Sequence, residues 1–435
     1  MPLLIVALGV LILLVLILLK VKPLYALLAV SLLVGLGEGM GFFPTIQSIG
    51  LGIWDTLKNI ALVLCLGAML GKMIETSGAA NRISDTLIAW FGKKNIQWAV
   101  MLTGLIVGIP LFYNAGFVIL IPLVFSIALS AEVPILLVGI PMAASLSVTH
   151  GFLPPHPGPT AIAAIFHADL GKTLLLGFVI ALPAIILAGP IFSRSLKNMN
   201  VAIAPTKVAS KKNQIELPNS KVSFFITLFP VVLIALCAIR QPVISNDRVI
   251  IILKFFGNPI TALSLALLLG VYIFWIRENK KPSELVSTFF QSIKDIALIV
   301  LVIAAGGAFK QVLIDGGVGI YIKTMATGFS LSPLLLAWSV AALIRVSLGS
   351  ATVAGLTAAG IVLPFLSVPG VHPELMVLSV GAGSLMFSHV NDTGFWMFKE
   401  YFNLSLKQTF LSWTMMETII SVTGLIGVLI LDKII

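Results

Sequence analysis

A proline- and glycine-rich stretch at residues 149–160 constrains this chain more than any other feature. It reads Thr-His-Gly-Phe-Leu-Pro-Pro-His-Pro-Gly-Pro-Thr and lies between two apolar segments, at residues 133–147 and 161–165. Proline removes a backbone donor and clashes with the preceding turn, so we expect a broken helix here. The flanking segments carry the break to membrane depth, where irregular backbone is tolerated only inside protein or beside a cavity. The stretch is therefore a candidate binding site, and an ordinary polar loop between two short helices is the alternative.

The composition identifies a membrane as the environment of the chain. Hydrophobic residues make up 59% and charged residues 10% of the sequence, whereas a typical soluble domain is about 25% charged. A net charge of +10 also suits nucleic acid, but the basic residues cluster in short loops between apolar segments, as the positive-inside rule expects. We therefore predict an all-α polytopic membrane protein that contacts membrane lipid and no nucleic acid.

Apolar runs and basic flanks predict the path of the first half, residues 1–193. The predicted spans are residues 3–19, 24–43, 57–73 and 173–192. An amphipathic helix at residues 79–91 is expected on the inner surface. Residues 96–130 are predicted to form a re-entrant hairpin with its tip at residues 110–116. Its first arm, residues 96–109, gives about 21 Å of helix against a hydrocarbon core of about 30 Å.

The second half, residues 222–435, follows a basic cytoplasmic linker at residues 194–221 and repeats the same plan upside down. The corresponding segments are spans at residues 222–238, 258–275, 293–314 and about 410–431, a hairpin at residues 331–366 and a second broken helix at residues 373–394. A surface stretch is expected at residues 317–327. The prediction is thus two inverted-topology repeats, each with a re-entrant hairpin and a broken transmembrane helix, a common plan of secondary transporters.

Four breaks in these segments supply candidate binding residues. Half-helix N-termini offer unpaired N–H groups and a partial positive charge to a carboxylate, while Asn, Ser, Thr and His side chains suit hydroxyl groups. The candidate substrate-binding residues are Tyr113, Asn114, His150, Gly151, Pro155, His156, Gly158, Gly349, Ser350, Thr352, Ser388, Asn391 and Thr393. The structural alternatives are that the histidines only lock the prolines and that Gly349–Thr352 is small for close helix packing.

Two charged residues stand near the second hairpin and the second break. An intramembrane carboxylate is costly and is functional by default, which favours a functional role for Asp392. Arg345 is either a counter-charge for the substrate or a partner for Asp392. The sequence contains no HExxH, Walker A or zinc-type Cys/His spacing, so we predict a transporter with no catalytic residue, metal or cofactor. A membrane-embedded enzyme with His150 or His156 as its base, and a passive channel, are the alternatives.

Four further motifs accompany residues 149–160 along the chain. They are Gly-Ala-Met-Leu-Gly-Lys at residues 67–72, Gly-Gly-Ala-Phe-Lys-Gln-Val at 306–312, Gly-Ser-Ala-Thr-Val-Ala at 349–354 and Ser-His-Val-Asn-Asp at 388–392. In this order, the five motifs resemble the gluconate:proton symporter family, the gluconate permeases. The match covers nearly the whole chain. The resemblance implies proton-coupled uptake of gluconate or a related sugar acid across a bacterial inner membrane, with idonate or D-serine as alternative substrates. It also implies the plan of the wider ion-transporter superfamily, whose members often form homodimers.

One position departs from the family pattern. Gluconate permeases commonly have an acidic residue after the Phe-Tyr of the first hairpin tip, where this chain has Asn114. Since Asn114 does not titrate, proton coupling needs another group near the breaks. We predict Asp392 as the leading proton carrier, helped by His389 or His150, because histidine titrates near physiological pH.

The basic loops predict that both termini lie outside the cell and that residues 193–221 lie inside. A reporter enzyme that is active only in the cytoplasm, fused after residue 210, is therefore expected to be active. A periplasmic signal at this position would overturn the topology, and the inversion of the two repeats with it.

Overall fold

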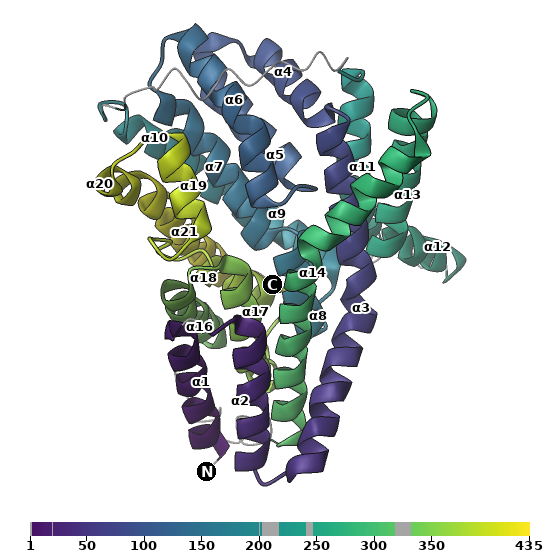
Figure 1. Cartoon of the computed structure of the whole chain (residues 1–435), viewed down its shortest axis with the longest axis vertical. Helices are drawn as coiled ribbons and strands as arrows, with labels where there is room; N and C mark the ends of the chain where they lie inside the picture. The colour runs from purple at the N-terminus through teal and green to yellow at the C-terminus, as the bar shows by residue number, and fades with distance from the viewer. Residues whose placement is uncertain (1, 20, 200, 202–216, 241–246, 318–331) are drawn as a thin grey trace.

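A computed structural model describes residues 2–19, 21–199, 201, 217–240, 247–317 and 332–435 of the chain (Figure 1). These residues form helices, turns and loops and contain no β-strand, as the sequence predicts. Within them, seven helical segments are long and apolar enough to cross a membrane, and the bent helix α3 makes an eighth. The prediction of an all-α protein with many membrane spans is confirmed.

The helices of the first half follow the apolar runs of the sequence. They are α1 (Pro2–Leu18), α2 (Pro23–Gly37), α3 (Phe42–Thr76), α4 (Ala79–Phe91), α5 (Ile96–Gly108), α6 (Tyr113–Ala131), α7 (Ile135–Phe152), α8 (Pro157–Phe166), α9 (Leu170–Ile186) and α10 (Phe192–Ser195). A 3-10 turn, η1 (Lys93–Asn95), precedes α5, and a π-helical turn, η2 (Leu187–Ile191), joins α9 to α10. Helix α4 has the bounds predicted for the amphipathic helix.

The second half contains a similar order of elements. They are α11 (Ser220–Arg240), α12 (Asp247–Gly257), α13 (Pro259–Val271), η4 (Tyr272–Ile276), α14 (Pro282–Asp315), α16 (Pro333–Leu348), α17 (Ala351–Val362), η5 (Leu363–Ser367), α18 (Pro373–Gly383), α19 (Thr393–Tyr401), α20 (Leu406–Thr409), η6 (Phe410–Thr414) and α21 (Met415–Leu431). Helix α12 was not predicted. Most of the predicted linker and of the stretch at residues 317–327 lies outside the described residues.

Helices α3 and α14 form the long axis around which the two halves meet. Each has more than thirty residues, and they lie side by side along much of their length (Figure 1). The spans predicted at residues 57–73 and 293–314 are therefore too short. The predicted bounds covered only the apolar part of each helix, whereas both helices continue through more polar turns. Helix α3 also bends by 42° near residues 59–60.

The two hairpins turn over short tips. Helix α5 connects to α6 through residues 109–112, and α16 connects to α17 through Gly349 and Ser350. The first tip was predicted at residues 110–116, but α6 begins earlier, at Tyr113. Gly349 has a φ of +78°, a conformation that favours glycine over other residues.

The broken helices are interrupted over different lengths. Helix α7 continues to Phe152 and α8 begins at Pro157, so only residues 153–156 of the predicted break at 149–160 are non-helical. Proline at the first position of a helix lacks only an N–H that would have no intrahelical partner, which is why Pro157 opens α8 without breaking it. The second break is longer, from Ser384 to Asp392, where Asp392 caps α19. The inverted orientation of the two halves stays a prediction.

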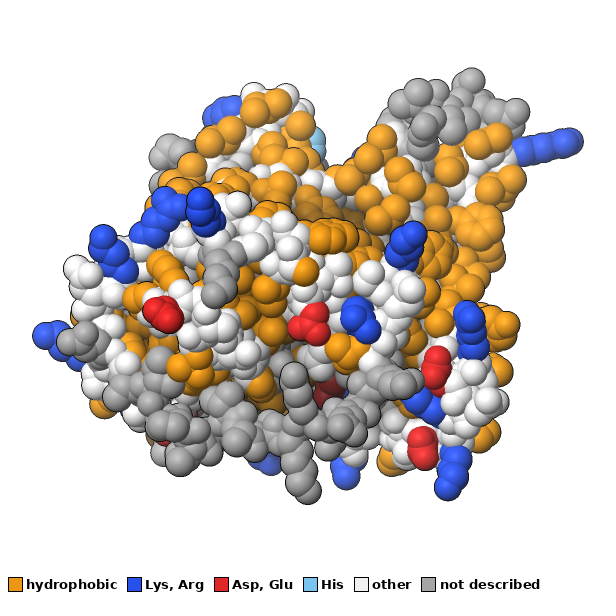
Figure 2. Space-filling model, turned by 90° about the horizontal axis from the view of Figure 1, so that it is seen from above, with side chains coloured by type: hydrophobic (Ala, Val, Ile, Leu, Met, Phe, Trp, Pro, Cys, Tyr) orange, Lys and Arg blue, Asp and Glu red, His pale blue; other side chains and the backbone are white. Residues whose placement is uncertain are grey.

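The surface of the molecule suits contact with lipid. Large hydrophobic side chains such as Phe43, Trp54 and Phe290 are exposed. Figure 2 shows hydrophobic side chains over much of the surface seen from above, with Lys and Arg side chains scattered around it. Extensive exposed apolar surface of this kind marks contact with a membrane or another protein.

The crossing of α3 and α14 predicts opposite effects for two neighbouring glycines. A Cβ at Gly52 would lie 2.8 Å from Ala308 Cα and would also meet the backbone oxygen of Gly307, whereas a Cβ at Gly50 meets nothing within 4 Å. Gly52→Ala should therefore destabilise the protein by about 1–3 kcal/mol through overpacking. Gly50→Ala should be neutral or stabilising, because alanine has the higher helix propensity. Thermal unfolding in detergent checks both, and equal melting temperatures for the two variants would contradict this packing.

Candidate functional site

A cavity of about 430 Å³ lies where the two hairpin tips and the second break approach α7, α14 and α21. Its polar wall combines residues from both halves of the chain. These residues are Lys22, Tyr113, Asn114, Ser147, His150, Arg345, Ser350, Thr352, Asp392, Thr393, Trp413 and Glu417, with Gly349 and Gly394 beside them. Residues far apart in the sequence thus share one chamber, and nine residues predicted from the sequence as binding or charged groups line it.

Four helices begin at the wall of this cavity: α2 starts there at Pro23, and the other three start at the hairpin tips and the second break. Helix α6 starts at Tyr113, α17 at Ala351 and α19 at Thr393. The first turns of α17 and α19 are capped by Ser350 and Asp392, whose side chains accept from Val353 N and Gly394 N. Helix α6 has no side-chain cap. Its first N–H groups therefore remain available to an anion, which the partial positive charge of a helix N-terminus favours.

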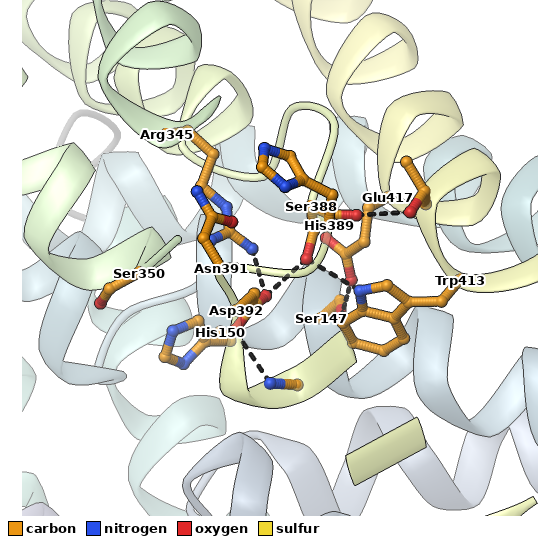
Figure 3. A network of polar contacts seen from close by, with 12 residues as sticks. Ser147, His150, Arg345, Ser350, Ser388, His389, Asn391, Asp392, Trp413 and Glu417 are labelled. Atoms are coloured by element: carbon orange, nitrogen blue, oxygen red, sulfur yellow. Dashed lines mark hydrogen bonds and ion pairs between the residues drawn. The ribbon is translucent and has the colours of Figure 1, made fainter. Parts of the chain in front are cut away.

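Arg345 and Asp392 form a largely buried ion pair in the wall (Figure 3). The Arg345 side chain is 2% exposed, and its Nη2 donates to Asp392 Oδ2. Its Nε and Nη1 are buried without a hydrogen-bond partner among the described residues. Arg345 is therefore a partner of Asp392 and also holds unused donors beside the cavity. Buried unpaired donors are costly, so their position favours a ligand that supplies acceptors.

Asp392 is held by several donors at once. Besides Arg345, it accepts from the hydroxyl of Ser388 and, at 2.9 Å, from Gly394 N. Ser388 in turn accepts from Trp413 Nε1 at 2.8 Å. Figure 3 shows this chain of contacts running from Arg345 through Asp392 and Ser388 to Trp413. Three donors thus fix the position of the Asp392 carboxyl group in the chamber wall.

His150 joins the first broken helix to the second hairpin. Its Nε2 lies 3.2 Å from Thr352 Oγ1, and its Nδ1 lies 3.3 Å from His156 Nε2. His156 and Pro155 do not line the large cavity but a narrow crevice behind it, together with Phe112. The two histidines predicted at the first break therefore lie in different places. His150 faces the cavity, and His156 contacts His150 from behind.

The other predicted residues lie outside the cavity wall. Asn391 donates to Val346 O at 2.7 Å, and His389 Nε2 lies 3.0 Å from the same oxygen. Gly151 packs closely against Leu385. Gly158 lies within α8, Ser388 is buried behind Asp392, and neither lines the large cavity. These residues position the breaks around the chamber.

Sequence reasoning missed Ser147, Trp413 and Glu417. All three are buried and line the cavity. Glu417 is 1% exposed and accepts a hydrogen bond from the Ser147 hydroxyl. The signal was present, because Glu417 is a carboxylate inside the apolar run at residues 410–431. The rule applied to Asp392 also selects Glu417.

A second cavity, of about 320 Å³, lies on the other side of the first hairpin tip. Lys72, Glu75 and Asp295 line it, and Lys72 pairs with Glu75 at 3.0 Å. Phe112 and Asn114 line both this cavity and the large one. The tip of the first hairpin therefore stands between two chambers.

The model of the GntP family permeases matches residues 1–434 of the chain. The chain belongs to this family. Over its full length, the permease is 52% identical to the "High-affinity gluconate transporter" of Escherichia coli (strain K12), with that protein also covered completely. It is 49% identical to the "Gnt-II system L-idonate transporter" of the same organism and 47% identical to the "Gluconate permease" of Bacillus subtilis (strain 168), each with complete coverage of both chains.

The fold of this GntP permease is also similar to that of a solved transporter. The YdaH transporter of Alcanivorax borkumensis, described as having an unusual topology, matches with a TM-score of 0.63 and 15% identity over 90% of this chain and 89% of that one. Family and relatives are named as permeases and transporters. The prediction of a membrane transporter of the bacterial inner membrane, and not an enzyme, is confirmed.

The cavity predicts which introduced cysteines a polar thiol reagent reaches. In a variant without Cys65 and Cys237, cysteines at Asn114 and Ser350 should react, because both positions line the chamber. A cysteine at Ser145, which is fully buried outside the chamber, is the matched control and should remain unlabelled. Mass spectrometry measures the labelling at all three positions, and an absence of labelling at both cavity positions would contradict this geometry.

Proposed function

We propose that this GntP permease carries gluconate or a closely related sugar acid into the cell together with a proton. The names of the relatives support the substrate class, since gluconate transporters and permeases match over the whole chain. The L-idonate transporter at 49% identity supports idonate as the nearest alternative. D-serine remains a further alternative from the family resemblance, because it is also a small hydroxylated carboxylate.

The main observation behind this proposal is that Nε and Nη1 of Arg345 have no hydrogen-bond partner among the described residues. A sugar acid has one carboxylate, which either of the free donors of Arg345, Nε or Nη1, can bind together with the uncapped N-terminus of α6. Guanidinium groups bind carboxylates with well-defined geometry and more strongly than neutral donors do. The chamber volume of about 430 Å³ falls within the usual range for small-molecule sites, about 300–1,000 Å³.

The remaining polar wall suits the hydroxyl groups of a sugar acid. Asn114, Ser350 and Thr352 offer amide and hydroxyl groups. The Tyr113 hydroxyl is buried without a hydrogen-bond partner among the described residues and is therefore free to take one. A site built to hydrogen-bond hydroxyl groups discriminates against analogues that lack them.

Proton coupling, inward transport and homodimer formation are parts of this proposal that rest on the family resemblance. The sequence prediction names Asp392, helped by His389 or His150, as the proton carrier. His150 lines the chamber, whereas His389 contacts the backbone of α16 outside it. His150 is thus the better supported of the two histidines.

Uptake by purified protein in lipid vesicles tests the proposal. An inward proton gradient should drive labelled gluconate to a higher concentration inside than outside, and an uncoupler should abolish this accumulation. Unlabelled gluconate, L-idonate and D-serine in excess should rank the substrates by competition. Substrate should also protect a cysteine at Ser350 from labelling. Equilibration without accumulation would indicate a passive channel, and accumulation driven only by a sodium gradient would overturn proton coupling.

A further inference from the structure

Glu417 is a second carboxyl group in the chamber wall, in the first turn of α21. Helix α21 directly follows the π-helical turn η6, a type of helix distortion that often occurs at functional sites. The Glu417 side chain is 1% exposed. One oxygen accepts from the Ser147 hydroxyl, and the other, Oε2, is buried and has no hydrogen bond within the described part of the chain.

The two carboxyl groups of the chamber have different surroundings. Asp392 accepts from a guanidinium, a hydroxyl and a backbone N–H, which together stabilise its charge. Glu417 accepts from a single hydroxyl and forms no ion pair among the residues described. Burial without a cation disfavours an ionised carboxylate. Such a difference between two acidic groups commonly assigns them different roles.

We propose that Glu417 carries the coupled proton, while Asp392 stays ionised as the partner of Arg345. This inference deepens the proposed symport of a sugar acid and rests on it. When the chamber faces outside, one Glu417 oxygen takes a proton from water in the chamber. When the chamber faces inside, this O–H bond breaks and the proton passes to water. The Ser147 hydroxyl serves both states, because it donates to the carboxylate and can accept from the neutral acid.

The charges of the chamber explain how the proton and the substrate are coupled. The charges of Arg345 and Asp392 cancel, and Lys22 lies at the exposed edge of the chamber. A bound sugar acid and an ionised Glu417 therefore place two negative charges in the buried part of the chamber. Protonation of Glu417 removes one of them. Proton and sugar acid therefore bind together more favourably than either binds alone, which is the thermodynamic requirement for coupling.

The groups that face Glu417 come from several elements. Tyr113 comes from α6, Arg345 from α16 and Asp392 from the second break, while His150 of α7 lines the same chamber. Arg345 is already occupied by Asp392. Helices α9 and α18, which also pack against α21, carry their charges in their first turns, at Lys172 and Glu374.

Glu417→Gln tests this assignment in the same vesicles, because glutamine still accepts the Ser147 hydrogen bond but holds no exchangeable acidic proton. The variant should keep exchange of labelled for unlabelled gluconate and lose accumulation driven by a proton gradient. Calorimetry should show that wild-type affinity for gluconate falls as pH rises, with a coupling of roughly 5- to 150-fold, and that the variant loses this dependence. Glu374→Gln, a carboxylate outside the chamber, should behave as wild type.

Asp392→Asn should instead change gluconate affinity by a similar factor at every pH, because it alters the partner of Arg345 and leaves the proton-carrying group in place. The assignment is overturned if Glu417→Gln still accumulates gluconate, or if Asp392→Asn is the variant that keeps exchange and loses accumulation. Failure of the wild-type protein to respond to a proton gradient would overturn the symport itself, a separate result. If Glu417→Gln does not fold, Ser147→Ala keeps the inference testable. Loss of a donor to ionised Glu417 should move the pH dependence of binding to higher pH, and an unchanged profile would contradict the assignment.

Discussion

The structure depends on one constraint: backbone groups freed by a helix break find no hydrogen-bond partner in hydrocarbon and must be satisfied inside the protein. At the first break, His156 N bonds to Leu153 O at 3.0 Å, and at the second, Asp392 N bonds to His389 O at 2.9 Å. The hairpin tips obey the same constraint, with Ser350 capping α17. Gathering the breaks in the interior satisfies these groups, and it also brings three helix N-termini to one chamber.

The Arg345–Asp392 pair is better understood as part of a binding site than as a source of stability. A buried ion pair gains little net free energy, because removing two charges from water costs about as much as their attraction returns. Here the pair is also incomplete, since two donors of Arg345 lack partners within the described chain. A bound carboxylate would complete it. Asp392 keeps the empty chamber close to neutral, so Arg345 is tolerated while no substrate is present.

The sequence predicted most of the helical plan but only part of the site, for physical reasons. The amphipathic pattern placed α4 correctly, and prolines located the first break. The length of that break was overestimated, because proline at the start of a helix is compatible with it. Side-chain directions within the second break were not readable, so His389 and Asn391 were grouped with the binding residues although both contact Val346 O. Glu417 itself could have been selected by the rule applied to Asp392, but its contact with Ser147, 270 positions away, depends on how α7 packs against α21 and could not be predicted.

The uncharged amide of Asn114 suits a chamber wall that already contains two acidic groups. Asn114 lies in the first turn of α6, the helix N-terminus that has no side-chain cap, and it lines both chambers beside the hairpin tip. A carboxylate at this position would interact favourably with the N-terminus of α6 and would compete there with the carboxylate of a substrate. It would also add a third acidic group to a chamber that already holds Asp392 and Glu417. An uncharged side chain leaves the N-terminus of α6 available to an anion, and the proton-carrying role then falls to a carboxyl group elsewhere in the wall.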